Sequence, residues 1–168
     1  MPKIIENLEQ RLIEEARKQI SESGYGAVTI RSVAKGCGVG IGTVYNYFPS
    51  KDDLVASFMA ADWKECLAVI TATGSNADNA ELLLRCIYDQ LHIFTSMHRS
   101  IIQDRDAATG FAGSFGKYHA LLRGQLAAPL RKFCADDFTA EFLAESMLAW
   151  TMNGKEFQQL YQVISKLL

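Results

Sequence analysis

Residues 29–54, which read TIRSVAKGCGVGIGTVYNYFPSKDDL, contain the pattern that decides the fold. Thr29 is a good N-cap for a helix of about two turns that runs through Lys35. The glycines at positions 36, 38 and 40 are not expected to continue that helix, because each interior glycine costs ~1 kcal/mol relative to alanine. A second short helix is expected over residues 41–48, since Pro49 disfavours helical geometry in the residue before it. The segment therefore predicts two short helices joined by a tight glycine turn.

The segments on both sides of this pattern are also expected to be helical. Apolar residues from Ile5 to Ile20 recur at helical spacing and indicate an amphipathic helix that stops at the glycines around Tyr25. Ser50 caps a longer helix that ends at about residue 73. Further helices are expected over residues 75–96, opened by Ser75 and Asp78, then over 99–105, over 114–134 with a kink or break at Pro129, over 139–152 and over 155–168, with a mobile loop at 107–113. No strand pattern is present, so the sequence predicts an all-α fold.

Charge is unevenly distributed along the chain. The formal net charge of the 168 residues is −2, yet no acidic residue occurs from Ser23 to Lys51. The same stretch carries Arg31, Lys35 and Lys51. One face of the protein can therefore approach phosphate groups without meeting a like charge, although the whole molecule is acidic.

The cysteines and the apolar runs exclude several other classes of protein. Cys37, Cys66, Cys86 and Cys134 form no CxxC pair, so neither a metal site nor a disulfide framework is indicated, and free buried thiols are expected. No apolar run approaches the ~20 residues that a membrane span needs. We therefore expect a cytoplasmic protein.

The second short helix has two distinct faces. Val44 and Phe48 share one face and are expected to anchor the helix on Val33, Ala34 and Leu54. The remaining face carries small and polar side chains, which suit the major groove of DNA; they are Gly42, Thr43, Asn46 and Tyr47.

Residues 8–55 resemble the signature of the TetR/AcrR family of transcriptional regulators. The matching positions are Thr29-Ile30-Arg31, Ala34, Gly38-Val39, Gly42-Thr43-Val44-Tyr45-Asn46-Tyr47-Phe48, Lys51 and Leu54. The resemblance implies a three-helix, helix-turn-helix DNA-binding domain over residues 1–50 and a helical ligand-binding and dimerisation domain over residues 51–168. It also implies a homodimeric repressor, which binds a pseudo-palindromic operator and is released by a small, largely apolar or aromatic ligand.

The resemblance assigns roles to the DNA-binding residues. Arg31, Ile41, Gly42 and Thr43 are expected to face base edges, and Thr29, Tyr45, Tyr47 and Lys51 to hold phosphates, with Asn46 on the same surface. Many family members have Ser or Thr where this chain has Gly40, and a polar residue where it has Ile41. Ile41 can contact a thymine methyl group, so an A/T preference is expected at one position. The competing interpretation makes Tyr45 and Tyr47 ordinary packing aromatics and Lys51 the first residue of a solvated helix.

The C-terminal part carries weaker indications. Aromatic and histidine side chains near the middle of helices are candidates for a ligand site: Trp63, Tyr88, His92, Phe94, Phe115, Tyr118 and His119. Apolar residues of the last two helices are candidates for a dimer interface: Phe142, Met147, Trp150, Phe157, Leu160, Tyr161 and Ile164. Both sets also fit ordinary core packing. A ligand near Trp63 is expected to act through the helix that begins at Lys51, by swinging the DNA-binding unit.

Three other functions compete with DNA binding. Asp89 and His92 are one helical turn apart, but no nucleophile or third ligand accompanies them, so neither an enzyme nor a metal site is expected. A redox sensor is possible through Cys37. The strongest alternative is a helical adaptor that binds protein in place of DNA, and the salt dependence of binding distinguishes the two.

Overall fold

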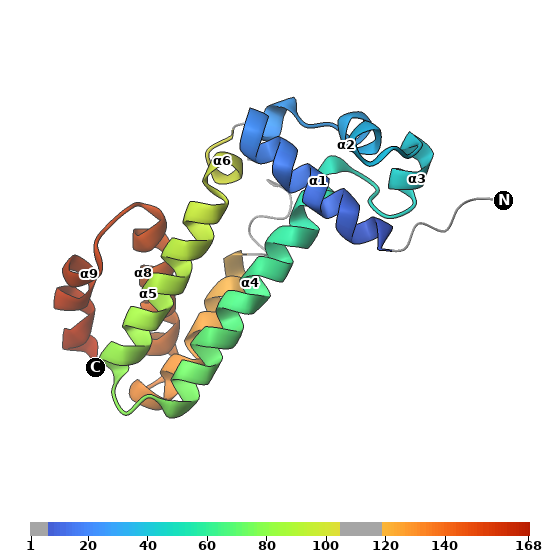
Figure 1. Cartoon of the computed structure of the whole chain (residues 1–168). Helices are drawn as coiled ribbons and strands as arrows, with labels where there is room; N and C mark the ends of the chain where they lie inside the picture. The colour runs from blue at the N-terminus through green and yellow to red at the C-terminus, as the bar shows by residue number, and fades with distance from the viewer. Residues whose placement is uncertain (1–6, 105–118) are drawn as a thin grey trace. The chain divides into compact units, whose positions relative to one another are not determined.

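The computed structural model describes residues 7–104 and 119–168, and these residues form helices joined by turns (Figure 1). The α-helices are α1 (Leu8–Ser23), α2 (Ile30–Cys37), α3 (Ile41–Tyr45), α4 (Lys51–Asn76), α5 (Ala80–Met97), α6 (Arg99–Ile102), α8 (Asp137–Met152) and α9 (Phe157–Ile164), with a further helix over residues 119–130. Short 3-10 helices are η1 (Tyr25–Ala27), η2 (Arg131–Phe133) and η3 (Ser165–Leu167). The expected all-α fold is confirmed. Within the described ranges, none of the helices has both the length and the apolar character of a membrane span.

The chain divides into two compact units. Unit 1 comprises Met1–Ala61 and His98–Ala112, and unit 2 comprises Asp62–Met97 and Gly113–Leu168. Unit 1 thus contains the whole segment expected to bind DNA, together with the first residues of α4 and the short helix α6. The loop expected over residues 107–113 lies outside the described residues.

The core of unit 1 is built on α1. Leu12, Ala16 and Ile20 recur every four residues and are buried, so one stripe of α1 packs against the rest of the unit. Val44 and Phe48 are 0% and 5% exposed and belong to the same cluster. The two residues expected to anchor the second short helix therefore do so.

Both short helices end at different residues from those expected. α2 continues through Gly36 and Cys37 and stops at Gly38, whose φ of 69° suits glycine. The side chain of Glu15, on α1, lies over Gly36 in the space that a Cβ at this position would occupy. α3 ends at Tyr45, and the chain then turns sharply, since Phe48 must reach the core before Pro49.

Side-chain caps set helix boundaries that periodicity misplaces in unit 2. Asn79 opens α5 by accepting a hydrogen bond from the Leu82 N–H at 3.0 Å, whereas Ser75 belongs to α4. Asp136 opens α8 by accepting from the Thr139 N–H at 2.7 Å, so this helix begins at Asp137, before the expected residue 139.

Pro129 does not break its helix. The helix continues to Leu130, and only then does the chain enter η2. Gly74 of α4 faces Pro129 so closely that a Cβ on the glycine would meet the proline ring. The absence of a side chain at position 74 allows α4 and the helix over residues 119–130 to approach each other.

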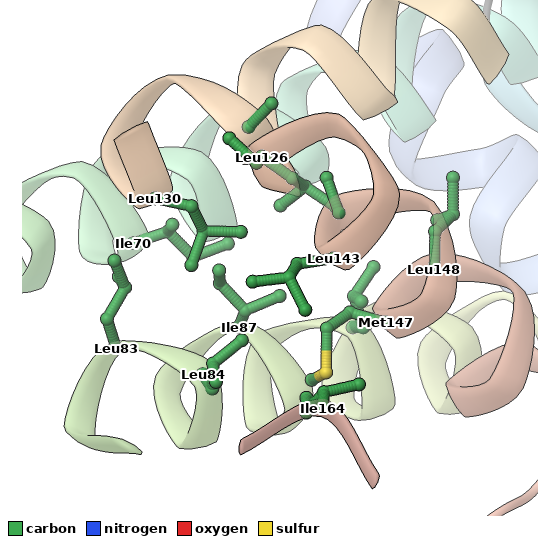
Figure 2. Close-up of a cluster of buried hydrophobic side chains, with 14 of the residues drawn as sticks. Ile70, Leu83, Leu84, Ile87, Leu126, Leu130, Leu143, Met147, Leu148 and Ile164 are labelled. Atoms are coloured by element: carbon green, nitrogen blue, oxygen red, sulfur yellow. The ribbon is translucent and has the colours of Figure 1, made fainter. Parts of the chain in front are cut away.

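The centre of the unit 2 core is formed largely by branched aliphatic side chains and one methionine that converge between its helices (Figure 2). They come from α4, α5, the helix over residues 119–130, α8 and α9: Ile70, Leu83, Leu84, Ile87, Leu126, Leu130, Leu143, Met147, Leu148 and Ile164. α5 packs against α8 and α9. Contacts between segments distant in sequence thus hold this unit together.

Two leucines of α5 provide a test of this core. Leu84 is fully buried, whereas Leu82, two residues earlier on the same helix, is 52% exposed. Leu84→Ala is expected to lower the free energy of unfolding by roughly 2–5 kcal/mol, through lost burial and the cavity left behind. Leu82→Ala should change it by about 0.5 kcal/mol or less. Denaturant unfolding measures both variants, and equal losses would mean that α5 does not present Leu84 to the core.

Candidate DNA-binding site

The start of α2 is fixed by a reciprocal pair of hydrogen bonds. The Thr29 hydroxyl accepts from the Ser32 N–H at 3.0 Å, and the Ser32 hydroxyl accepts from the Thr29 N–H, also at 3.0 Å. This capping box satisfies two backbone donors that a helix N-terminus otherwise leaves open. It also sets the positions of Thr29 and Arg31, both of which are exposed.

The side chains of α3 and of the turn after it lie on two faces, one buried and one exposed, as expected from the sequence. Ile41, Tyr45 and Tyr47 are 37%, 53% and 45% exposed, respectively. Gly42 and Asn46 are also exposed, and Thr43 is half-buried. The two tyrosines are therefore not core residues of unit 1, and the competing interpretation of them as ordinary packing aromatics is not supported.

A shallow groove runs between η1, α2, α3 and the start of α4. It is lined by Gly26, Val28, Thr29, Ile30, Arg31, Ile41, Tyr45, Pro49, Ser50 and Lys51. Five of the nine residues expected to bind DNA lie in this lining: Thr29, Arg31, Ile41, Tyr45 and Lys51. The other four lie on α3 or in the turn after it: Gly42, Thr43, Asn46 and Tyr47. The lining carries two basic side chains and no acidic one.

Lys51 is held in place by Tyr25. Its ammonium group donates to the Tyr25 carbonyl oxygen at 3.2 Å and lies 3.8 Å from the centre of the tyrosine ring. The Tyr25 hydroxyl in turn hydrogen-bonds the carboxylate of Asp52. Lys51 is thus a positioned cation at the edge of the groove, and not a freely solvated one.

Tyr25 is the part of this arrangement that sequence reasoning missed. The glycines on either side of it indicate a turn, but a turn tyrosine carries no sign that it will be 1% exposed. The sequence signal that could have indicated its burial is an aromatic residue four positions before the Thr29 cap. It points inward because η1 turns the chain back between α1 and α2.

The candidate ligand residues form separate contacts in unit 2. The Trp63 indole N–H donates to Gln125 Oε1 at 2.7 Å, and its ring meets Phe94 edge-on at 5.5 Å. Tyr88 stacks on His92, which is exposed. His119 lies 3.5 Å from Glu145. Phe115 and Tyr118 lie outside the described residues.

A shallow groove in unit 2 lies elsewhere. It runs between α4 and the helix over residues 119–130 and is lined by Leu67, Thr71, Gly74, Ser75, Gln125, Ala128, Pro129 and Lys132. None of the five candidate ligand residues that the structure describes lines this groove, although Gln125, which does, accepts a hydrogen bond from Trp63. Sequence reasoning missed this groove because the close approach of Gly74 and Pro129 is a long-range contact.

Four of the seven residues expected at the dimer interface are buried within their own chain. Met147, Phe157, Leu160 and Ile164 are each less than 9% exposed and belong to the core of unit 2. Met147 lies on α8, and Phe157, Leu160 and Ile164 form the apolar stripe by which α9 packs onto α5 and α8, so all four side chains contribute to the core of their own unit. Tyr161 is half-buried and stacks on Phe157. Phe142 and Trp150 remain 47% and 49% exposed on α8.

The structure gives no support to the redox alternative. Cys37 is buried at the end of α2, and its thiol hydrogen-bonds the Arg11 carbonyl oxygen. Burial, followed by the nearby Glu15 carboxylate, raises the pKa of the Cys37 thiol and so disfavours the reactive thiolate. Burial likewise raises the pKa of Cys66 and Cys134. Over the described ranges, no group of three or more His, Cys, Asp or Glu side chains could hold a metal ion.

Residues 12–58 match the model of the family described as bacterial regulatory proteins, tetR family. This range contains α2, α3, most of α1 and the groove residues. The transcriptional repressor KstR of Rhodococcus jostii is 38% identical over 55 residues, which are 33% of this chain and 26% of KstR. The matched segments span 24–32% of the length of the curated relatives.

Solved structures match over nearly the whole chain, at low identity. The TetR family repressor AlkX of Dietzia sp. strain DQ12-45-1b, implicated in n-alkane biodegradation, is 15% identical and has a TM-score of 0.65, with 93% of each chain covered. The regulator FadR of Bacillus subtilis, in complex with stearoyl-CoA, is 18% identical and has a TM-score of 0.53, with 94% of each chain covered. These two likenesses concern the fold alone. Residues 12–58 thus match the tetR family of bacterial regulatory proteins, and the fold of the described chain is similar to that of TetR family regulators.

Proposed function

We propose that this protein is a repressor that binds a pseudo-palindromic operator as a homodimer, through the groove of unit 1 and the exposed face of α3. The observation that carries the proposal is the composition of that surface. It combines a guanidinium, an ammonium, two tyrosine hydroxyls and a buried apolar anchor, in a stretch of chain without a carboxylate from Ser23 to Lys51. On the same resemblance to the non-enzymatic TetR family, we propose that the protein binds DNA and does not catalyse a reaction.

The two kinds of side chain in the groove suit two kinds of contact. Lys51, held by Tyr25, and Thr29, at the start of α2, are suited to phosphate oxygens. Arg31 has a fork of donors that can read guanine in the major groove, and Ile41 can contact a thymine methyl group. Gly42 has nothing within 4 Å of the position of a Cβ, so the backbone of α3 can come close to the bases.

Selection of random duplex DNA on the purified protein, at two salt concentrations, tests the function directly. The expected result is an enriched inverted repeat whose half-site centres are about 34–36 Å apart, or a multiple of that distance. Binding should weaken steeply with salt, because phosphate contacts release counterions. Retention that is independent of both sequence and salt would instead support the adaptor alternative.

Arg31→Ala tests base reading at the groove. The variant should weaken binding to the selected operator roughly 10- to 100-fold and relax the preference at one base pair of each half-site. Lys18→Ala, which removes one positive charge from an exposed position of α1 outside the groove, is the matched control. Fluorescence anisotropy on operator variants measures both. Equal losses for the two variants would show that Arg31 contributes only charge.

The proposed homodimer requires an apolar surface, and α8 offers one. Phe138 and Phe142 are 77% and 47% exposed, with ring centres 6.4 Å apart, and Trp150 is exposed further along the same helix. A cluster of exposed aromatic side chains is unusual unless a partner covers it. Paired helices from two subunits would then bury it in a four-helix arrangement.

Phe142→Asp should shift the protein from dimer to monomer, because an unpaired carboxylate would be buried in the interface. Ile93→Asp, at a position of α5 that is 46% exposed, introduces the same charge elsewhere in unit 2. Sedimentation equilibrium gives the mass of each variant, and operator affinity should fall only for the variant that dissociates. A Phe142→Asp variant that stays dimeric would exclude this face.

We also propose a small effector with a large apolar or aromatic part. The support is the aromatic content of unit 2 around Trp63 and Phe94 and the complex of the structurally similar FadR with stearoyl-CoA. An effector can release the operator only if it binds the free form more tightly than the DNA-bound form. We propose that the effector acts by swinging unit 1 through α4. We also propose that the protein acts in the cytoplasm.

A further inference from the structure

A seam of polar contacts joins α1 to α2 within unit 1. Arg11, Glu15 and Gln19 recur every four residues and lie on one face of α1. At the end of α2, an Arg11 guanidinium N–H donates to the Cys37 carbonyl oxygen at 3.3 Å, and the Cys37 thiol returns a bond to the Arg11 carbonyl at 3.4 Å. Between the two ends, Glu15 lies over Gly36. These three α1 residues are called the polar seam below.

At the N-terminal end of α2, every polar group of the Gln19 side chain forms a hydrogen bond. Its Oε1 accepts from the Ser32 hydroxyl at 2.6 Å. Its Nε2 donates to the Ser32 carbonyl at 3.1 Å and to Glu15 Oε1 at 2.7 Å. The Gln19 amide thus uses its one oxygen acceptor and both of its N–H donors, so its side chain fits in only one orientation.

The residue that Gln19 holds is the one that caps α2 together with Thr29. The Ser32 hydroxyl accepts the Thr29 N–H, and the Ser32 N–H donates to the Thr29 hydroxyl. Arg31 is the neighbour of Ser32 in the chain. A restraint on Ser32 therefore acts on both predicted DNA-contacting residues of the first turn of α2.

We propose that Gln19 is a positioning residue for operator recognition: through Ser32 it holds Thr29 and Arg31 in the geometry that reads the half-site, without contacting DNA itself. This inference rests on the proposed function. Base contacts depend on geometry, whereas non-specific binding depends on charge, and Gln19 is neutral. Loss of Gln19 therefore lowers specific affinity and leaves non-specific affinity unchanged.

Gln19→Ala is compared with Gln10→Ala in the full-length protein. Gln10 belongs to the same helix and also pairs with a glutamate four residues away, Glu14, but on an exposed face. Gln19→Ala should weaken binding to the selected operator about tenfold and random duplex less than about twofold, while Gln10→Ala changes neither. Circular dichroism at the assay temperature verifies that both variants are folded.

A charge-neutral rescue separates positioning from general stability. Gln19→Glu alone sets two carboxylates against each other at positions 15 and 19, so operator affinity falls. In Glu15→Gln combined with Gln19→Glu, the new carboxylate can accept from both the Ser32 hydroxyl and the new amide, and the net charge equals that of the wild type. The double variant should bind the operator more tightly than Gln19→Glu alone, because two of the three contacts return. It should remain weaker than the wild type, because a carboxylate oxygen then faces the Ser32 carbonyl oxygen in place of the Nε2 donor.

Amide hydrogen exchange in the free protein makes the two possible failures distinguishable. Gln19→Ala should speed exchange at Ser32 and Val33, relative to Gln10→Ala. If the wild type enriches an operator but Gln19→Ala binds it as tightly, or exchange at Ser32 is unchanged, the positioning role is wrong. If the wild type enriches no operator, the proposed function is wrong, and the positioning role falls with it.

Discussion

The burial of Val44 and Phe48 is the interaction on which the proposed DNA-binding surface depends. α3 has only five residues, which is far too short for a helix to be stable in isolation. It exists because Val44 is fully buried in the core of unit 1 and Phe48 closes the turn behind it. Once these two side chains are fixed, helical geometry determines which neighbours face outward. The exposure of Tyr45, Asn46 and Tyr47 is thus a consequence of packing on the opposite side.

The groove next to α3 is shaped by a second constraint, the position of η1. Tyr25 is buried in this turn, and its ring and carbonyl oxygen together hold the ammonium group of Lys51. A lysine at the start of a helix normally loses considerable side-chain entropy when it binds a phosphate. In this protein, Lys51 has already lost part of its side-chain entropy on folding, before any ligand binds. The same reasoning applies to Thr29, which the capping box with Ser32 fixes in advance.

Much of unit 1 could be predicted because its determinants are local. The Thr29 cap and the Val44–Phe48 spacing act over fewer than five residues, and the structure agrees with both. The glycine turn exists, but it begins at Gly38 and not at Gly36, because α2 continues to Cys37. Gly36 shows the limit of this reasoning. Glycine is unfavourable inside a helix, and the sequence does not reveal that Glu15 of α1 will occupy the space a side chain would need.

In unit 2 the determinants are distant contacts, and prediction was correspondingly weaker. Periodicity places Phe157, Leu160 and Ile164 on one face of α9, but it cannot say whether that face meets α5 of the same chain or a second subunit. The structure assigns it to the chain's own core. The apolar residues left for a partner are those that face away from this core, such as Phe138 and Phe142 on α8.

The polar seam shows why a surface for reading bases needs more than exposed side chains. Several candidate contact residues lie on short or terminal segments: Thr29 and Arg31 at the start of α2, and Ile41 and Thr43 in the five residues of α3. Such segments fray unless tertiary contacts hold them, and fraying lowers the fraction of molecules in the binding geometry. α1 prevents this in two ways, through the buried stripe around Ala16 and through the hydrogen bonds of Gln19. The apolar contacts around Ala16 stabilise the unit, while the hydrogen bonds of Gln19 fix the orientation of the first turn of α2.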